Sequence, residues 1–436
     1  MTHHQPSDSQ DINYATMSPT PCVILLGTCD TKLEEFLFLR DEIKRNNADV
    51  MLMDVGRSYT EHESIDISQR QLLAEFGHGD ISDLPRGEVI KAMAACATAA
   101  VKKLYEGEKI HGIINAGGSG GTSLAAEVMR SVLPIGFPKM ITSTVASGDT
   151  GPIVGETDIS MMYSVVDVAG LNTVLRNILS NAGAAIAGMS AAYQYRQRAN
   201  KEEKKGKEKR VGVTMFGVTT PAVDTIRKHL ESHYDVEMFV FHATGHGGRA
   251  MEQLVREGAI DAVLDLTTTE ICDHITDGVM SAGPHRLEAA AAAGIPYIVS
   301  VGATDMSNFG PKHTVPERYR ERRLFEHNPV VTLMRTSSAE ARDTGNFIAE
   351  KLKTTAKKPN MVEVWLPTGG VSVLSTLGAP FEDREADEEM FKAIRDGLRG
   401  CGIAVVEREE AVNDEVFAVA IAEALVGKMG LKKGMM

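Results

Sequence analysis

A glycine-rich stretch, NAGGSGGTS at residues 115–123, has the composition of an anion-binding turn. It follows the apolar run KIHGII and precedes LAAEVMRSVL, which is the pattern of a strand, a turn and a helix start. Backbone N–H groups in such a turn point at one spot, and with the helix dipole they favour phosphate. Thr122 or Ser123 would cap the helix or donate to that phosphate. The competing interpretation is a tight turn where strand and helix pack closely.

Small and polar residues also follow the other predicted strands. Ligands of open α/β sheets bind outside the carboxyl ends of the strands, so these exits together predict a binding site. The exits span 27–32, 54–57, 143–151, 217–221, 242–249, 267–270, 302–308 and 366–375. We expect nucleotide contacts from Gly27, Thr28, Asp30, Thr31, Lys32, Gly117, Gly118, Ser119, Gly120, Gly121, Thr122, Ser147, Asp149 and Thr150.

Charged side chains at these exits suggest more specific roles. Lys32 would supply a positive charge to phosphate, or it is an exposed lysine in the first turn of a helix. Asp30, Asp54 and Asp149 would hold Mg²⁺, or they are turn and cap residues. His242, His246 and Glu270 would serve as acid and base or bind a metal, whereas a loop histidine is often only solvated.

Known nucleotide motifs do not match. GTCDTKL at 27–33 lacks the second glycine and the hydroxyl residue of a Walker A loop. GGSGGTS approaches the dinucleotide fingerprint, but no acidic ribose ligand follows on the next strand, which argues against NAD.

Apolar strand patterns alternate with helical patterns along most of the chain, which predicts α/β architecture with mainly parallel sheets. The order begins again after residue 210. RVGVTMFGVTTPAV at 210–223 resembles PCVILLGTCDTKLE, and GIPYIVSVGA at 294–303 resembles GFPKMITSTVA at 136–146. We therefore expect two Rossmann-like lobes of similar topology with a ligand cleft between them.

The expected boundaries follow from composition. Residues 1–20 are polar and predict a disordered tail, and the charged stretch 196–210 predicts a linker. The first lobe would span 21–195, with an insertion near 57–95, and the second 211–436.

The overall charge limits the classes of partner. The chain has 436 residues, with 46 Lys and Arg against 59 Asp and Glu, a formal net charge of −13. This argues against nucleic acid or an anionic membrane as a partner. Five scattered cysteines without a C-x-x-C pair argue against a disulfide scaffold or a zinc site. With no secretory signal pattern, we expect a cytoplasmic protein.

Five segments together resemble the family of the tomato mosaic virus resistance protein: GTCDTK, DVGR, NAGGSGGTS, STVASGDTG and TDISMMYSVVDVAGLN. The resemblance covers residues 21–430. It implies two Rossmann-like subdomains, ATP with a divalent cation such as Mg²⁺, and self-association as a homodimer or larger homo-oligomer. Plant members continue into a barrel domain, which we expect this chain to lack.

Three functions remain open from the sequence. The chain could be an enzyme that uses ATP and Mg²⁺ on a small anionic metabolite in the cleft. It could instead be a nucleotide-binding regulator or interaction protein without turnover. The third possibility is a metal-assisted lyase or hydrolase that does not use ATP.

Overall fold

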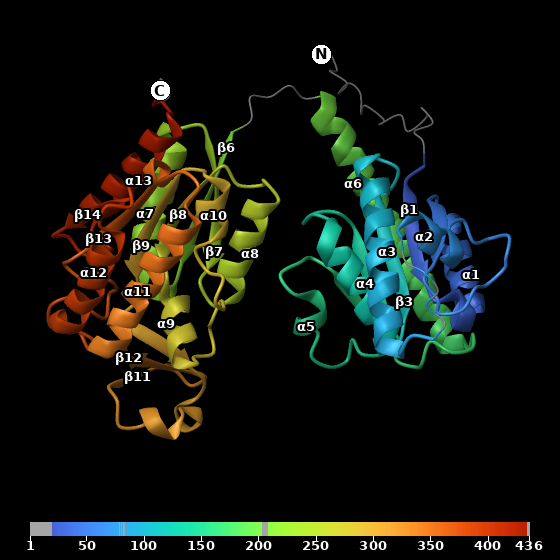
Figure 1. Cartoon of the computed structure of the whole chain (residues 1–436), viewed down its shortest axis with the longest axis horizontal. Coiled ribbons are helices and arrows are strands. Elements are labelled where there is room, and N and C mark those ends of the chain that lie inside the picture. Colours follow the sequence, from blue (N-terminus) through green and yellow to red (C-terminus); the bar gives the residue numbers. More distant parts are fainter. Residues whose placement is uncertain (1–19, 78, 80, 82, 203–207, 434–436) are drawn as a thin grey trace, which may run out of the picture. The chain divides into compact units, whose positions relative to one another are not determined.

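The computed structural model describes residues 20–433, apart from 78, 80, 82 and 203–207. The chain divides into two compact units, Met1–Lys205 and Gly206–Met436, each with its own sheet (Figure 1). All of the predicted tail except Thr20 lies outside the described residues.

The first unit is built on a parallel five-stranded sheet with the order β2-β1-β3-β4-β5. Its strands are β1 Cys22–Gly27, β2 Asp49–Asp54, β3 Gly112–Gly117, β4 Lys139–Ser143 and β5 Ser160–Tyr163. Its helices are α1 Cys29–Arg45, α2 Gln69–Glu75, α3 Arg86–Glu106, α4 Ser119–Val132, α5 Gly151–Val154 and α6 Thr173–Glu202.

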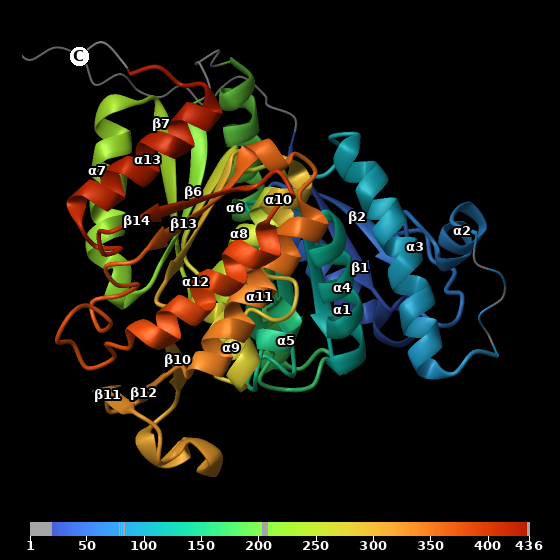
Figure 2. The same ribbon diagram turned by 60° about the vertical axis from the view of Figure 1, so that its left-hand side comes forward.

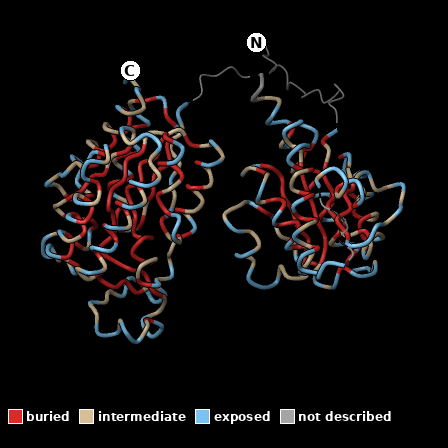
Figure 3. Tube along the Cα trace, viewed as in Figure 1, coloured by how far each residue is buried: buried red, intermediate tan, exposed pale blue. Residues whose placement is uncertain are grey.

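Helices cover both faces of this sheet. Alternate residues of β1 belong to opposite cores: Ile24 and Leu26 pack with α3 and α4, whereas Val23 and Leu25 pack with α1 and α6. Because both faces are buried, the strand reads as the continuous apolar run CVILLG rather than as an alternating one. Figure 3 shows the buried residues gathered along the strands.

The second unit has a six-stranded sheet with the order β14-β13-β9-β8-β6-β7 and a separate antiparallel sheet with the order β10-β12-β11. Its strands are β6 Lys209–Met215, β7 Val236–His242, β8 Ala262–Thr267, β9 Tyr297–Gly302, β10 Met306–Phe309, β11 Leu324–Asn328, β12 Val331–Arg335, β13 Val362–Pro367 and β14 Ala404–Arg408. Its α-helices are α7 Thr220–His233, α8 His246–Arg256, α9 Thr269–Thr276, α10 Ala289–Ala293, α11 Ser338–Thr355, α12 Arg384–Leu398 and α13 Glu415–Met429. Short 3₁₀ turns are η1 Gly217–Thr219, η2 Lys312–Thr314, η3 Glu317–Tyr319 and η4 Pro359–Met361.

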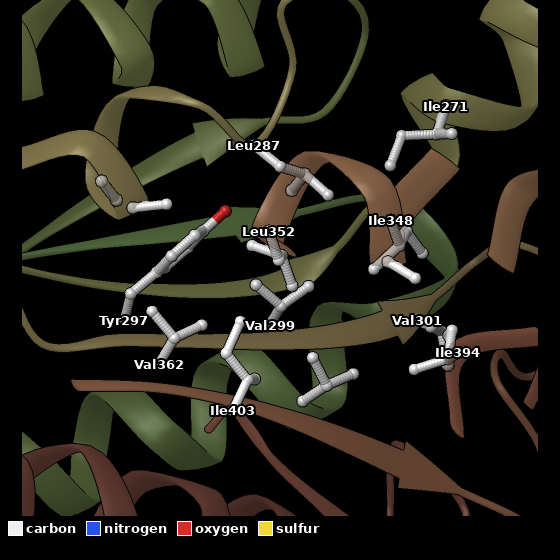
Figure 4. Packing of buried hydrophobic residues seen from close by; sticks show 14 of the residues in the cluster. Ile271, Leu287, Tyr297, Val299, Val301, Ile348, Leu352, Val362, Ile394 and Ile403 are labelled. Carbon is white, nitrogen blue, oxygen red and sulfur yellow. The ribbon is translucent and has the colours of Figure 1, made fainter. Parts of the chain in front are cut away.

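Two apolar cores enclose the larger sheet. One joins it to α8, α10, α11 and α12, and Figure 4 shows Tyr297, Val299 and Leu352 interdigitating there. The other joins it to α7 and α13, which lie side by side (Figure 2). Both units are therefore three-layer α/β structures.

The two sheets repeat one topology, as the sequence echoes predicted. The order β7-β6-β8-β9-β13 in the second unit matches β2-β1-β3-β4-β5 in the first, and β14 extends it by one strand. The order in which strands are added to each sheet reverses beside its first strand, between β1 and β3 in the first unit and between β6 and β8 in the second. This reversal leaves a crevice at the carboxyl ends of those strands, where ligands of such sheets bind.

Two features differ from the sequence predictions. Helix α6 continues to Glu202, so the first half of the predicted linker is helical. Its Arg, Gln, Lys and Glu residues are good helix formers, and a charged composition alone does not end a helix. The antiparallel sheet β10-β12-β11 is the second difference, because we assigned no separate sheet to residues 306–335.

None of the helices in the described part of the chain is both long and apolar enough to cross a membrane.

Candidate functional site

The amino-terminus of α4 is open. Gly118 precedes the helix in an extended conformation, and no side chain caps the first turn. The N–H groups that begin a helix have no partner within it, and the helix dipole adds partial positive charge at this end. This 14-residue helix therefore presents unused donors at the carboxyl end of β3.

The glycines at this turn are not explained by the fold. None of Gly117, Gly118, Gly120 and Gly121 has a positive φ, so the backbone does not require glycine there. A Cβ atom added at these positions would have nearest neighbours at 3.8, 3.7, 3.5 and 4.0 Å respectively, which are ordinary van der Waals distances. Neither backbone conformation nor close packing of a Cβ therefore requires glycine at these four positions. Close approach of a ligand to the backbone is another reason for glycine, and ligand contact here stays a prediction.

Asn115, the last polar residue of β3 before this turn, adds a buried group without a partner. Its side-chain nitrogen donates a 2.7 Å hydrogen bond to the backbone oxygen of Leu26 in β1. Its Oδ1 atom is buried and has no hydrogen-bond partner in the described structure. That oxygen lies 4.0 Å from the positions that a Cβ would take on Gly117 and Gly121. Because buried polar atoms normally have partners, this oxygen marks a place for a ligand hydroxyl or a water.

The end of β4 forms the neighbouring wall. The hydroxyls of Thr122 and Ser143 share a hydrogen bond of 2.6 Å, and Thr144 donates from its backbone to Gly117 at 3.2 Å. Thr122 is thus buried and bonded within the protein. We expected it to contact a nucleotide, but its side chain instead joins α4 to β4.

Sequence reasoning missed Arg86, the first residue of α3. Its Nη2 atom lies 3.5 Å from the position of a Cβ on Gly120, so the guanidinium lies beside the first turn of α4. Arg86 is exposed, and within the described ranges it makes no hydrogen bond or ion pair. A cation without an internal partner beside a helix amino-terminus is suited to bind an anion. No local motif marks it, because Arg86 lies more than thirty residues from the turn.

Two residues predicted to contact the nucleotide at the start of α1 also have structural roles. The ammonium of Lys32 donates a hydrogen bond to the backbone oxygen of Val168 in the loop after β5, and its contact with phosphate stays a prediction. A Cβ on Gly27 would lie 2.5 Å from the ring of Phe36, so this glycine is required by packing. The hydroxyl oxygens of Thr28 and Thr31 lie 3.3 Å apart at the exposed start of the helix.

The three predicted magnesium ligands do not form one cluster. No group of three or more His, Cys, Asp or Glu residues that could hold a metal occurs among the residues that the structure describes. Asp30 and Asp54 do lie together, since a Cβ on Gly56 would approach both carboxylates within 3.0 Å. Asp149 accepts a local hydrogen bond of 3.0 Å from the backbone of Gly151.

The two neighbouring carboxylates differ in access. Asp54 is fully buried, and burial raises the pKa of its carboxyl against the lowering effect of hydrogen bonds from Gly56 and Cys29. Asp30 is partly exposed and accepts backbone hydrogen bonds of 3.0 and 3.1 Å from Arg57 and Ser58. Of the pair, Asp30 is the carboxylate that a bound cation could reach.

The loop after β4 is exposed and locally bonded. Ser147 and Asp149 are exposed, and Thr150 begins the short helix α5. The hydrogen bonds found for these residues stay within the loop and α5. Their predicted contact with a nucleotide stays a prediction.

In the second unit, Glu270 belongs to a buried ion network rather than to an acid–base pair. Its carboxylate accepts from the backbones of Gly245 and Gly248 at 2.7 and 3.0 Å, and from Arg286 Nε at 2.7 Å. Arg286, also buried, donates to both oxygens of Asp265 at 2.5 and 2.6 Å. Three hydrogen bonds and an ion pair thus hold Glu270 in the interior of the second unit, and its catalytic assignment stays a prediction.

The two predicted catalytic histidines are exposed at the ends of β7 and α8. The ring of His242 meets Phe216 edge-on at 5.5 Å, and His246 Nδ1 lies 3.0 Å from Arg249. The catalytic role of both histidines stays a prediction.

The corresponding strand ends of the second unit carry buried side chains. Thr219 and Thr267, at the ends of β6 and β8, share a hydrogen bond of 2.8 Å and are fully buried. A small apolar core that includes Phe216, Met306 and Phe381 covers this edge. The exits 267–270 and 302–308 are buried, whereas Gly217 and Pro221 in the exit 217–221 are exposed.

Comparison with protein families gives two matches that together span most of the chain. The N-terminal domain of an uncharacterised protein family, UPF0261, matches residues 21–195, and the C-terminal domain of the same family matches residues 208–429.

Several relatives are similar over nearly the whole chain. A UPF0261 protein of Clostridium tetani is 44% identical over 93% of this chain and 98% of its own length. The ToMV resistance protein Tm-1(GCR237) of Solanum lycopersicum is 40% identical over 94% of this chain, which spans only 56% of the tomato protein. This similarity confirms the family resemblance inferred from the motifs.

Solved structures give a weaker match. A UDP-N-acetylglucosamine 2-epimerase from Rickettsia bellii is 10% identical, with a TM-score of 0.22 over 64% of this chain and 78% of that protein. A likeness of this size supports no inference about this chain.

Proposed function

For this chain, which belongs to the UPF0261 family, we propose that the amino-terminus of α4 binds the phosphates of a nucleotide. The proposal is based on the geometry of the first unit, where no side chain caps this helix. The ligand we propose is ATP with Mg²⁺. The turn 117–121 supplies backbone donors, Arg86 supplies positive charge, and Asn115 accepts a hydrogen bond from the ligand or its water.

The main support for this proposal comes from four residues at which neither a positive φ nor close packing requires glycine: Gly117, Gly118, Gly120 and Gly121. A Cβ atom at any of them would make only ordinary contacts within the protein. A ligand that hydrogen-bonds the backbone supplies the missing reason for glycine, since only glycine leaves the N–H groups accessible from that side.

Magnesium fits this site only in part. Bound Mg²⁺ usually takes one or two carboxylates with phosphate and water, and Asp30 is the accessible carboxylate of its pair. When bound, the ion would neutralise phosphate charge. The protein residues contribute binding and orientation in this proposal.

The side chains around the α4 turn favour binding without turnover. A complete set of catalytic side chains is not assembled around the α4 turn in the described structure, and the second-unit carboxylate once assigned to catalysis is bound to Arg286. We therefore propose a nucleotide-binding protein that senses or presents its ligand. The metal-assisted lyase has the least support, because Glu270 is buried and paired with Arg286.

Calorimetric titration tests the proposal. Purified protein is titrated with ATP, ADP, AMP and NAD, each with and without Mg²⁺. The expected result is tighter binding with more phosphates, at one site per chain, because the proposed site is the glycine turn of the first unit. Absence of binding by every nucleotide would contradict the proposal, and two sites per chain would contradict the assignment to one unit.

A further inference from the structure

The loop after β5 carries a strained, exposed valine. Val165 has a φ of 62°, and Val166 donates to the backbone oxygen of Ser164 at 2.7 Å, so Val165 is the central residue of a γ-turn. This form of the turn, with a left-handed central residue, is rare and strained. A β-branched residue with positive φ is a true outlier, because its side chain crowds the backbone.

The surrounding structure holds this turn in place from both sides. Before it, buried Ser164 donates from its backbone to Ser143 at 3.1 Å. After it, Val168 is buried in the core beneath α1 and accepts a hydrogen bond from Lys32. Strained residues persist only where the structure around them fixes their conformation. Here the residues before and after the turn are both held by the first unit.

The fold itself gives no reason for valine at this position. Glycine adopts positive φ without strain, and asparagine tolerates it, so either would form this turn more easily. The Val165 side chain is 58% exposed and adds little to the core. Tyr163, two residues earlier, is 42% exposed at the end of the same edge strand. The turn therefore costs conformational energy and presents apolar surface to the outside.

This surface is connected to the phosphate site through two hydrogen bonds. Ser164 bonds to Ser143, and the hydroxyl of Ser143 bonds to Thr122 in the first turn of α4. The ends of β4 and β5 are adjacent in the sheet, with Ser143 paired to Tyr163. The apolar tip and the donors of α4 thus lie along one edge of the same sheet.

We propose that Tyr163 and Val165 form the contact surface for the base of the nucleotide whose phosphates bind at α4. This inference rests on the proposed function, and it adds the residues that contact the base of the nucleotide. An aromatic ring beside an exposed aliphatic group suits the flat face of a heteroaromatic base. The strain at Val165 is the cost of presenting that group in a fixed position.

The test compares ATP with inorganic tripolyphosphate, which has the phosphates but no base. Calorimetric titrations with Mg²⁺ use the wild-type protein, Val165→Gly, and Val330→Gly as the control. Val330 is 64% exposed in the hairpin between β11 and β12 of the second unit, so its substitution removes similar apolar surface elsewhere.

The expected result separates stability from binding. Val165→Gly should lower the affinity for ATP by about fivefold, the effect of losing part of a buried valine contact. The affinity for tripolyphosphate should not change. The same variant should unfold at an equal or higher denaturant concentration, because glycine relieves the strain. A purely structural role for Val165 would not weaken one ligand while sparing the other.

Two other outcomes have distinct meanings. If ATP and tripolyphosphate bind the wild type equally and Val165→Gly changes neither, the base contact is refuted and the phosphate site stands. If neither compound binds the wild type, the proposed function fails, and this inference fails with it.

Discussion

The side-chain nitrogen of Asn115 donates a 2.7 Å hydrogen bond to the backbone oxygen of Leu26, which ties β3 to β1 at the point where the sheet order reverses. This bond fixes the amide so that its buried oxygen faces the glycine turn before α4. The site is therefore built on the two strands whose carboxyl ends define the crevice, with a rigid acceptor beside the open helix.

Arg86 should contribute to ligand binding but not to folding. Arg86→Ala removes the cation beside Gly120, and we expect ATP affinity to fall by about tenfold, the usual value of one charged hydrogen bond. Stability should change by no more than about 0.5 kcal/mol, since the side chain is exposed. Titration calorimetry and denaturant unfolding measure the two effects.

Lys91→Ala is the matched control for this variant. Lys91 lies on the same helix, is exposed and makes only a long ion pair with Glu88 at 3.9 Å. Equal losses of affinity for the two variants would mean that general charge, rather than the position of Arg86, attracts the ligand.

Glu270 should matter for the stability of the second unit. Glu270→Gln breaks a fully buried pair with Arg286, and we expect a loss of about 3 kcal/mol of unfolding free energy. The single tryptophan of the chain, Trp365, lies in β13, so its fluorescence reports on this unit alone. Unchanged stability in this variant would contradict a structural role for the pair of Glu270 and Arg286.

Asp305 should make the second unit less stable as pH rises. Burial raises the pKa of its carboxyl to about 7 from an ordinary 3.8, against the opposing effect of Arg335; nearby Asp387 raises it further. The folded chain then holds a proton that the unfolded chain releases above pH 4. This contribution to stability is complete below about pH 4 and is lost as pH rises through 7.

Asp305→Asn removes this titration without a large change in shape. We expect its advantage in stability over the wild type to grow by about 1–3 kcal/mol between pH 5 and pH 8. Denaturant titrations followed by Trp365 fluorescence measure the difference at each pH. A constant difference across this range would show that Asp305 does not change protonation there.

The sequence was sufficient for the architecture because its signals are local. Apolar runs such as CVILLG mark buried parallel strands, and repeated motif order predicted the repeated strand order that the two sheets show. The glycine turn was also visible, since composition alone distinguishes it.

The partners of individual side chains could not be predicted, because they depend on residues distant in the chain. Lys32 bonds to Val168, and Glu270 bonds to Arg286, which follows it by sixteen residues across a loop. The sequence does not distinguish Gly27 from the glycines of the α4 turn. Only its close approach to the ring of Phe36 in the structure shows that packing requires glycine there. Arg86 reaches the site from another helix, so no motif includes it.

The glycine turn itself provides the most direct test. In Gly120→Val/Gly121→Val, the new side chains meet no atom closer than 3.5 Å from their Cβ positions, so the protein should fold. They would block the donors of α4. Gly188→Val, at a glycine in α6 with open space around it, controls for the addition of valine to a helix.

The measurement is calorimetric titration of both variants with ATP and Mg²⁺, after denaturant unfolding confirms that each is folded. Our account predicts no detectable binding by the double variant and wild-type affinity for Gly188→Val. Wild-type affinity in a folded double variant would contradict it, because the phosphates would then bind somewhere other than the start of α4.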